Sequence, residues 1–249
     1  MNMKTITNAI ARLKHAVSGA FSQYYHCDLC HQASYNQPLL CIDCQQTLAA
    51  FDWSHCANNL LHSPAIARYL SHQHYDALIA VAPHMRPFSD WIAQLKYARR
   101  FELATMLAQL MYQQIQATNI TADIMLPVPL SYARLRWRQF NQTVLLVKAL
   151  VKYSAIPCDF HYLRRQQSVR RQVGKSGAQR RRALRKAFYV VGDDMQLNGK
   201  HVLLIDDVVT TGTTVNTIAK LLKKHGAARV TVLSISVALY GNALSAQPK

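Results

Sequence analysis

The amino-acid sequence predicts an α/β fold, a mainly parallel sheet flanked by helices, with a small additional module at the N-terminus. Three observations predict this fold class. From residue 75 onward, apolar runs of strand length alternate with segments of helical periodicity, as in parallel sheets covered by helices. One such run, Val202–Ile205, leads into two carboxylates, a Thr/Gly loop and a further helix. Two Cys-x-x-Cys motifs precede all of these segments.

The composition limits the class of protein. A chain of 249 residues is long enough to bury a full α/β core beside one small module. Its 50% hydrophobic content, with eight glycines and eight prolines, is typical of a globular protein. No apolar run approaches the length of a membrane span, and Arg12 and Lys14 interrupt any signal-peptide core. We therefore expect a cytoplasmic protein.

The charge is strongly basic. Lysine and arginine number 29 against 12 acidic residues, for a net charge of +17. Such an imbalance favours polyanionic partners, of which nucleic acid is the commonest.

The most charged stretch, Arg164–Lys186, has ten basic residues and no acidic one. Its glycines and polar residues predict a mobile loop. Its arginines could clamp a pyrophosphate or follow a nucleic-acid backbone; alternatively, the stretch is only an unstructured solvated arm. The candidate residues are Arg164, Arg165, Arg170, Arg171, Arg180, Arg181 and Arg182.

Residues 1–25 are expected to form an amphipathic helix. Apolar residues recur at helical spacing, and basic residues lie on the other faces. The apolar residues are Ile6, Ile10, Leu13, Val17 and Phe21. Packing against the rest of the protein is favoured over membrane anchoring.

Residues 26–60 contain the paired knuckles Cys27-x-x-Cys30 and Cys41-x-x-Cys44. In a chain expected to be cytoplasmic, this spacing indicates a tetrahedral metal site, and four thiolates leave no open ligand position. We therefore predict a structural Zn²⁺ ion held by the four cysteines. A redox or disulfide pair is the alternative, and His26 or His31 could replace one thiolate.

The larger part of the chain gives the α/β pattern. The predicted strands are Ala77–Ala82, Asp123–Val128, Cys158–Tyr162, Ala187–Val191 and Val202–Ile205. Helical spacing extends from Trp91 to Ile115 with a break near residues 98–100, and again from Val215 to Lys224. A basic loop at Arg134–Gln142 is expected to lead into a helix that reaches Val151.

The stretch His201–Thr214 combines groups suited to one ligand. Backbone N–H groups at a helix N-terminus attract anions, threonine hydroxyls add donors, and Gly212 lets a phosphate approach the main chain. Asp206 and Asp207 follow a strand, where ligands of parallel sheets bind, and carboxylates accept hydrogen bonds from sugar hydroxyls. These groups suit a phosphorylated ribose. The alternative is a solvated acidic turn followed by an ordinary threonine cap.

This stretch resembles the 5-phosphoribosyl-1-pyrophosphate (PRPP) motif of type I phosphoribosyltransferases: a hydrophobic run, Asp-Asp, two small apolar residues and Thr-Thr-Gly-x-Thr. The order of the cysteine knuckles, LKYARRFELATMLAQLM, PVPLSYARLRWRQFNQ, the arginine loop and this motif resembles the ComF/ComFC competence family, whose relatives include GntX-type proteins. The resemblance covers residues 27–237. It implies a zinc-finger module at 26–60, a type I phosphoribosyltransferase-like domain at 61–240 and a tail at 241–249.

The resemblance also implies roles for individual residues. The catalytic candidates, expected to contact ribose hydroxyls, are Asp206 and Asp207. The candidates for the 5-phosphate are Thr210, Thr211, Gly212, Thr213 and Thr214. Lys96 is expected on the pyrophosphate side, and Mg²⁺ would accompany PRPP. The residues expected near the cleft are Arg134, Arg138, Asn141 and Gln142, while Gln172 and Arg180 match the family's loop pattern.

Two functional classes remain open. The resemblance implies a protein of natural transformation or DNA uptake that binds single-stranded DNA beside a competence helicase and a recombination-loading protein. Its pocket would bind PRPP or a nucleotide without turnover. The alternative is an active phosphoribosyltransferase with an unknown acceptor. This chain departs from the family pattern at Gln139, which stands where glycine is common, and at Ala183 and Lys186, which replace asparagine and glycine.

Overall fold

The computed structural model describes residues 26–34, 39–48, 56–71, 74–166, 187–192 and 197–238. The chain divides into two compact units, one within residues 1–49 and the other within residues 50–249. The predicted helix at 1–25, the predicted tail at 241–249 and most of the basic stretch, including Arg170, Arg171, Gln172 and Arg180–Arg182, lie outside the described residues.

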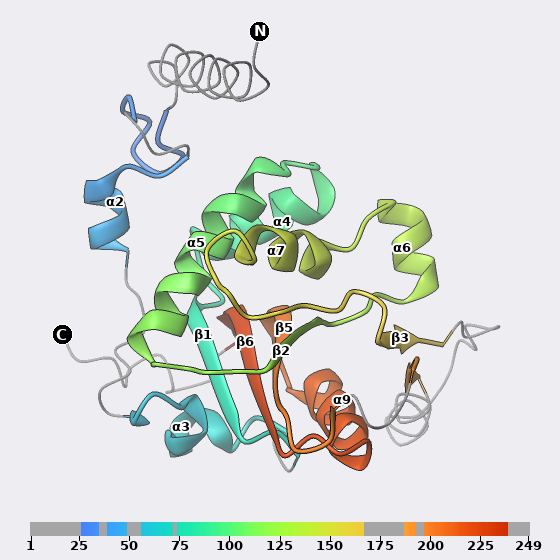
Figure 1. Cartoon of the computed structure of the whole chain (residues 1–249). Coiled ribbons are helices and arrows are strands. Elements are labelled where there is room, and N and C mark those ends of the chain that lie inside the picture. The colour runs from blue at the N-terminus through green and yellow to red at the C-terminus, as the bar shows by residue number, and fades with distance from the viewer. Residues whose placement is uncertain are drawn as a thin grey trace, which may run out of the picture. The chain divides into compact units, whose positions relative to one another are not determined.

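A four-stranded parallel sheet forms the centre of the larger unit, in the order β1-β6-β5-β2 (Figure 1). The strands are β1 (Ala77–Pro83), β2 (Ile124–Pro127), β5 (His201–Val209) and β6 (Arg229–Val237). All of β1 is buried, as is Val202–Ile205 of β5, because the sheet is covered on both faces. The predicted fold class is confirmed.

Helices supply the two covers. On one face, α4 (Phe88–Tyr97), α5 (Glu102–Ala117) and α7 (Gln142–Leu150) pack together, and α9 (Thr213–Lys224) packs on the other face (Figure 1). In α5 the fully buried residues Leu103, Leu107 and Met111 recur every four positions, which is the apolar stripe that the sequence predicts. In the described ranges, no helix has the length and apolar composition of a membrane span.

Short elements complete the larger unit. The 3₁₀ helix η3 (Leu60–His62) and α3 (Pro64–Ala67) precede β1. The Asn59 side chain fixes this segment, because its Oδ1 accepts hydrogen bonds from the N–H groups of Leu61 and Leu78. Farther along, β3 (Leu163–Arg165) pairs antiparallel with β4 (Phe188–Val190). The arginines Arg164 and Arg165 therefore belong to a strand, not to the loop that the sequence predicts.

The acidic pair lies inside a strand rather than after one. The sequence predicts that β5 ends at Ile205, but the strand continues to Val209 because β6 pairs along its whole length. Asp206 is opposite Ser234 in this register, and Val208 is opposite Ser236. Successive side chains of a strand point to opposite faces, so Asp206 and Asp207 face opposite sides of the sheet.

The predicted basic loop at Arg134–Gln142 is wrong for its first half. Tyr132–Arg138 forms the helix α6, in which the Ser131 hydroxyl accepts a hydrogen bond from the Arg134 N–H at 3.4 Å. Gln139 ends α6 in the left-handed conformation, with φ of 68°. The helix lacks a wide apolar stripe because most of its residues are exposed, which explains why periodicity did not reveal it.

One further strand prediction is wrong, and one strand of the sheet was not predicted. The segment Cys158–Tyr162 is not a strand, and it contributes one isolated bridge, between Cys158 and Met125 of β2. By contrast, β6 was not predicted, although it lies in the middle of the sheet. Its sequence alternates valine and isoleucine with Thr231, Ser234 and Ser236, and these polar side chains are fully buried.

Candidate functional site

The carboxylate of Asp207 accepts hydrogen bonds from two neighbouring helices. Lys96 Nζ, from the last turn of α4, lies 2.7 Å from Asp207 Oδ2. Gln142 Nε2, from the first turn of α7, donates to the same oxygen at 2.7 Å. The other oxygen accepts the Val208 N–H at 2.7 Å. Because only 5% of Asp207 is exposed, these donors hold its carboxylate in one orientation.

The second carboxylate has a different environment. Asp206 Oδ1 accepts the N–H of Asp207 at 2.9 Å. Burial raises the pKa of Asp206 to about 8, and the charge of Asp207 acts in the same direction. A cation bound beside Asp206 would favour its ionised form. A carboxylate is a hard oxygen donor, and Mg²⁺ is commonly held by one or two carboxylates together with substrate phosphates. Both oxygens of Asp207 already accept hydrogen bonds, and Asp206 faces the other side of the sheet. Asp206 together with the ligand's phosphates is therefore the donor set that fits Mg²⁺.

The Thr/Gly loop joins β5 to α9 and packs on the segment before β1. Gly212 caps α9 in the left-handed conformation, with φ of 69°. A Cβ atom at Gly212 would lie 2.8 Å from the Ser71 carbonyl oxygen and 2.9 Å from the Tyr75 hydroxyl. The Ser71 N–H donates to the Thr211 carbonyl at 2.8 Å, which anchors the loop from the same side. Only glycine fits between this anchor and the left-handed turn.

The threonines present hydroxyls around the N-terminus of α9. The hydroxyls of Thr211 and Thr213 are 2.9 Å apart. Thr210 and Thr211 are exposed, while Thr213 and Thr214 are half-buried. Since the first N–H groups of a helix have no partner within the helix, this loop presents backbone and hydroxyl donors together to an anion.

A buried arginine extends the hydrogen bonds of Asp207 away from the sheet. Arg138, at the end of α6, is 7% exposed and donates to Gln142 Oε1 at 3.1 Å. Its other terminal nitrogen donates to the Tyr97 hydroxyl at 3.2 Å. Gln142 thus accepts from Arg138 and donates to Asp207, so that one chain of hydrogen bonds joins α6, α7 and β5.

His84 is a residue of this region that sequence reasoning missed. It follows β1, where its N–H donates to the Val237 carbonyl at 2.8 Å and its Nδ1 lies 2.8 Å from Ser236 Oγ. Burial, followed by the charge of Lys96, lowers the pKa of His84, while the carboxylate of Asp207 opposes this shift. Its place after a strand, at the edge where parallel sheets bind ligands, was the available signal.

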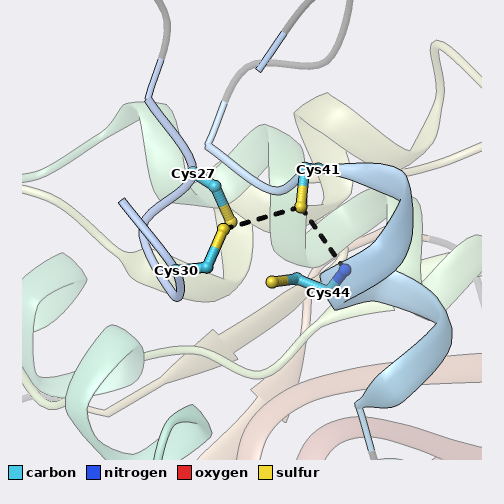
Figure 2. Close-up of side chains that lie close together, drawn as sticks. All are labelled: Cys27, Cys30, Cys41 and Cys44. Carbon is cyan, nitrogen blue, oxygen red and sulfur yellow. Dashed lines mark hydrogen bonds between the residues drawn. The ribbon is translucent and has the colours of Figure 1, made fainter. Parts of the chain in front are cut away.

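The four predicted metal ligands come together in the smaller unit. The sulfurs of Cys27, Cys30, Cys41 and Cys44 lie within 4.8 Å of one another (Figure 2). Cys41 precedes α2 (Ile42–Thr47), and its sulfur accepts the Cys44 N–H at 3.4 Å. None of the four forms a disulfide. The cluster can hold one metal ion, and four sulfur donors are compatible with a zinc module.

Electrostatics at this cluster also favour metal binding. Burial acts to raise the pKa of Cys27, but backbone N–H groups of Cys30 and Cys41 outweigh it and lower the pKa to about 6. Burial and the neighbouring thiols raise the pKa of Cys44. Mutual repulsion of crowded thiolates is relieved when a cation binds among them.

Comparison with known proteins identifies the family. Residues 108–243 match the phosphoribosyl transferase domain family. DNA utilization protein YhgH of Escherichia coli O157:H7 is 34% identical over 212 residues, which cover 83% of this chain and 87% of that protein. The chain belongs to the ComF family. Competence protein F of Haemophilus influenzae is 29% identical and covers 79% of this chain; 90% of that protein is matched. Competence protein ComFC of Streptococcus pneumoniae is 24% identical, over 79% of this chain and 86% of that protein.

The residues expected near the cleft from the family resemblance have three different environments: a buried network, a backbone cap and the exposed surface. Lys96, Arg138, Gln142 and Asp207 form the buried network above. Asn141 serves the backbone instead, because its Oδ1 accepts the Thr143 N–H and its Nδ2 donates to the Val128 carbonyl.

Arg134 is exposed and lies outside the buried network. Burial, followed by the charge of Arg134, lowers the pKa of Arg165. Arg164 contacts His161 Nδ1 at 2.7 Å. Tyr97, which the sequence reasoning did not assign, contacts Arg138 and is therefore an addition to the site.

Proposed function

We propose that this protein acts in natural transformation or DNA utilization, binding single-stranded DNA and a magnesium-bound phosphoribosyl ligand. The single observation that carries the ligand assignment is the contact of Lys96 and Gln142 with Asp207. Asp207 lies on β5, the strand that leads into the Thr/Gly loop. The relatives named for competence and DNA utilization support the biological role.

The proposed pocket divides the ligand among different groups. The 5-phosphate binds the N-terminus of α9 through Thr210–Thr214, where backbone N–H groups and the helix dipole favour anions. Asp206 and Asp207 accept hydrogen bonds from the ribose hydroxyls. Lys96 supplies positive charge on the pyrophosphate side. When bound, Mg²⁺ would neutralise pyrophosphate charge, and Asp206 would hold it together with the ligand's own oxygens.

The proposal also includes the metal, the domain bounds, the location and the partners that the sequence led us to expect. The module at 26–60 holds structural Zn²⁺, and the phosphoribosyltransferase-like domain spans residues 61–240. The protein is cytoplasmic, and a competence helicase and a recombination-loading protein are its expected partners.

Metal analysis of protein purified without chelator tests the zinc assignment. We expect one Zn²⁺ per chain and its loss in a Cys44→Ser variant; metal-free protein would overturn the assignment.

Calorimetry with Mg²⁺-PRPP tests the pocket. Wild type is expected to bind, and Asp206→Asn is expected to weaken binding because it removes an acceptor and a charge. Glu102→Gln is the matched control, since it removes one negative charge from an exposed side chain of α5. Equal affinities for Asp206→Asn and Glu102→Gln would contradict the ribose assignment.

Binding of single-stranded DNA is tested separately over a salt series. Contacts between arginines and phosphates release counterions, so affinity should fall steeply as salt rises. We expect neutralisation of Arg164, Arg165, Arg170 and Arg171 to weaken binding and to reduce that slope. Binding without salt dependence would contradict the proposal.

Active transfer is the second candidate function. The buried ion pair of Lys96 and Asp207 favours it, because preorganised charge stabilises a departing pyrophosphate without reorganisation during the reaction. A nucleophile would form a bond to C1 of the ribose as the bond to the pyrophosphate oxygen breaks. Pyrophosphate release from Mg²⁺-PRPP with pooled acceptors is the measurement. Release no greater than in Asp206→Asn would exclude turnover under those conditions.

A further inference from the structure

An exposed surface of aromatic and arginine side chains covers α6 and the junction of α4 with α5. Its members are Tyr97, Phe101, Tyr132, Trp137, Arg134 and Arg136, named here the aromatic–arginine surface. Trp137 is 67% exposed and Tyr97 is 60% exposed, values that are high for large aromatic residues. Neither ring serves the core of the fold.

Ring contacts hold the two segments of this surface together. The rings of Tyr97 and Trp137 lie 5.7 Å apart, and those of Phe101 and Phe140 lie 4.9 Å apart in an edge-to-face arrangement. Tyr97 ends α4 and Phe101 immediately precedes α5, while Trp137 lies in the last turn of α6 and Phe140 follows that helix. The exposed rings of Tyr97, Phe101 and Trp137 therefore pack against partner rings before any ligand binds.

The buried guanidinium of Arg138 contacts the exposed ring of Tyr97. The Arg138 guanidinium lies 4.9 Å from the centre of the Tyr97 ring and donates to the Tyr97 hydroxyl. Since Arg138 also donates to Gln142, Tyr97 is anchored to the network that holds Asp207. The aromatic–arginine surface is therefore fixed to the proposed phosphoribosyl pocket.

The charge of this surface indicates a polyanion. Tyr132–Arg138 contains three arginines and no acidic residue. Arg134 and Arg136 are exposed, and the Arg136 guanidinium lies 5.9 Å from the centre of the Tyr132 ring. Exposed rings between arginines match a ligand in which flat apolar groups alternate with negative charges. That description fits single-stranded nucleic acid, whose bases stack on aromatic rings while its phosphates contact arginines.

We infer that the aromatic–arginine surface is a base-stacking site for single-stranded nucleic acid. Unpaired bases stack on Trp137 and Tyr97, and the adjoining phosphates contact Arg134 and Arg136. The inference rests on the proposed binding of single-stranded DNA and adds a location and a contact type, because the basic stretch at 164–186 offers arginines but no aromatic residue.

Binding measurements with a Trp137→Ala variant test this inference. Removal of one stacking ring is expected to weaken binding of a deoxythymidine oligomer roughly tenfold. Trp137→Phe keeps a flat ring and should recover most of the affinity. The matched control is Tyr153→Ala, which removes a 37% exposed ring that stacks on Tyr112 and whose nearest neighbours in sequence include no arginine. Tyr153→Ala should bind as wild type does.

A strand without bases separates stacking from charge. An abasic oligomer of equal length keeps every phosphate, so phosphate contacts alone would give it equal affinity. Stacking predicts that wild type binds the abasic strand more weakly, and that Trp137→Ala reduces this preference. Quenching of Trp137 fluorescence by the thymidine strand, absent in Trp137→Ala, is an independent readout. An oligouridine arm distinguishes RNA from DNA.

The outcomes separate this inference from the proposed function. If wild type binds single strands with a steep salt dependence but Trp137→Ala and Tyr153→Ala bind equally, the stacking site is refuted and the proposed function stands. If wild type binds no single strand, both are refuted. Binding of anionic phosphatidylglycerol vesicles through Trp137, without single-strand binding, would instead assign the surface to a membrane.

Discussion

Lys96 Nζ lies 2.7 Å from Asp207 Oδ2, and 16% and 7% of the two side chains are exposed. The pair joins the last turn of α4 to a central strand of the sheet. Removing one member of a buried ion pair leaves the other without compensation. The contact that fixes the position of α4 is therefore the same contact that places Lys96 in the proposed pocket. The stability of the fold and ligand binding share this ion pair.

Lys96→Met is expected to lower the free energy of unfolding by about 3 kcal/mol, measured by urea denaturation, because Asp207 stays buried and charged. Lys223→Met is the control, since Lys223 pairs with Asp76 at 2.6 Å but both side chains are about one-third exposed. The control should cost less than about 1 kcal/mol. Equal losses would show that burial does not distinguish the two pairs.

The raised pKa of Asp206 predicts a pH dependence. Its pKa is about 8 in the folded protein against 3.8 as the usual value, so the folded state binds more protons between these limits. The contribution of Asp206 to stability is therefore full below pH 4 and is lost as pH rises through about 8. Unfolding measured across this range should show a steeper decline for wild type than for Asp206→Asn. Parallel curves would contradict the shift.

The same carboxyl links ligand binding to protons. Magnesium-bound PRPP favours ionised Asp206, so binding near neutral pH should release protons and strengthen as pH rises. Calorimetry in two buffers of different ionisation enthalpy measures that release, and Asp206→Asn should reduce it.

Gly212→Ala should disrupt the loop more than a left-handed φ alone explains. Gly199→Ala is the control, because Gly199 has φ of +73° and nothing within 4 Å of an added Cβ. The control pays only the backbone cost, about 1 kcal/mol. Gly212→Ala adds the clash with the Ser71 carbonyl and should cost at least about 1 kcal/mol more. Equal decreases of the unfolding temperature in the two variants would show that the loop accommodates the added Cβ atom without strain.

Gln139→Gly is expected to stabilise the protein, by up to about 1 kcal/mol, since glycine adopts the left-handed end of α6 without steric cost. Gln113→Gly, at an exposed position inside α5, should instead destabilise it by about 1 kcal/mol. Denaturant midpoints of the two variants should move in opposite directions. A lower midpoint for Gln139→Gly would show that its side-chain bond to the Arg136 carbonyl matters more than the backbone.

Sequence reasoning succeeded where one physical cause dominates. The buried run of β5, the stripe of α5 and the cysteine spacing each report a single requirement: burial on two faces, burial on one face, or four ligands for one ion. The fold class and the gathering of the four cysteines could therefore be predicted. So could the elements that carry Lys96 and Asp207, because each follows or ends a clearly periodic segment.

The failures involve elements held by side-chain contacts that are distant in sequence. The helix α6 depends on its cap and on burial of Arg138, which no periodicity reports. The strand β6 carries buried polar residues, and partners such as His201 for Thr231 and His84 for Ser236 come from other strands or their ends. The reach of Gln142 to Asp207 spans 65 positions in the chain, and it follows from tertiary packing alone.

The buried side chain of Arg138 donates hydrogen bonds to two different partners. One terminal nitrogen serves Gln142 and the other serves Tyr97, so its guanidinium cannot move toward one partner without leaving the other. A ligand that shifts Gln142 on the Asp207 side, or Tyr97 on the aromatic side, therefore changes the hydrogen bond of Arg138 on the other side. The affinities for sugar phosphate and for single strands are therefore expected to be linked, and thermodynamics requires each ligand to change the other's affinity by the same factor.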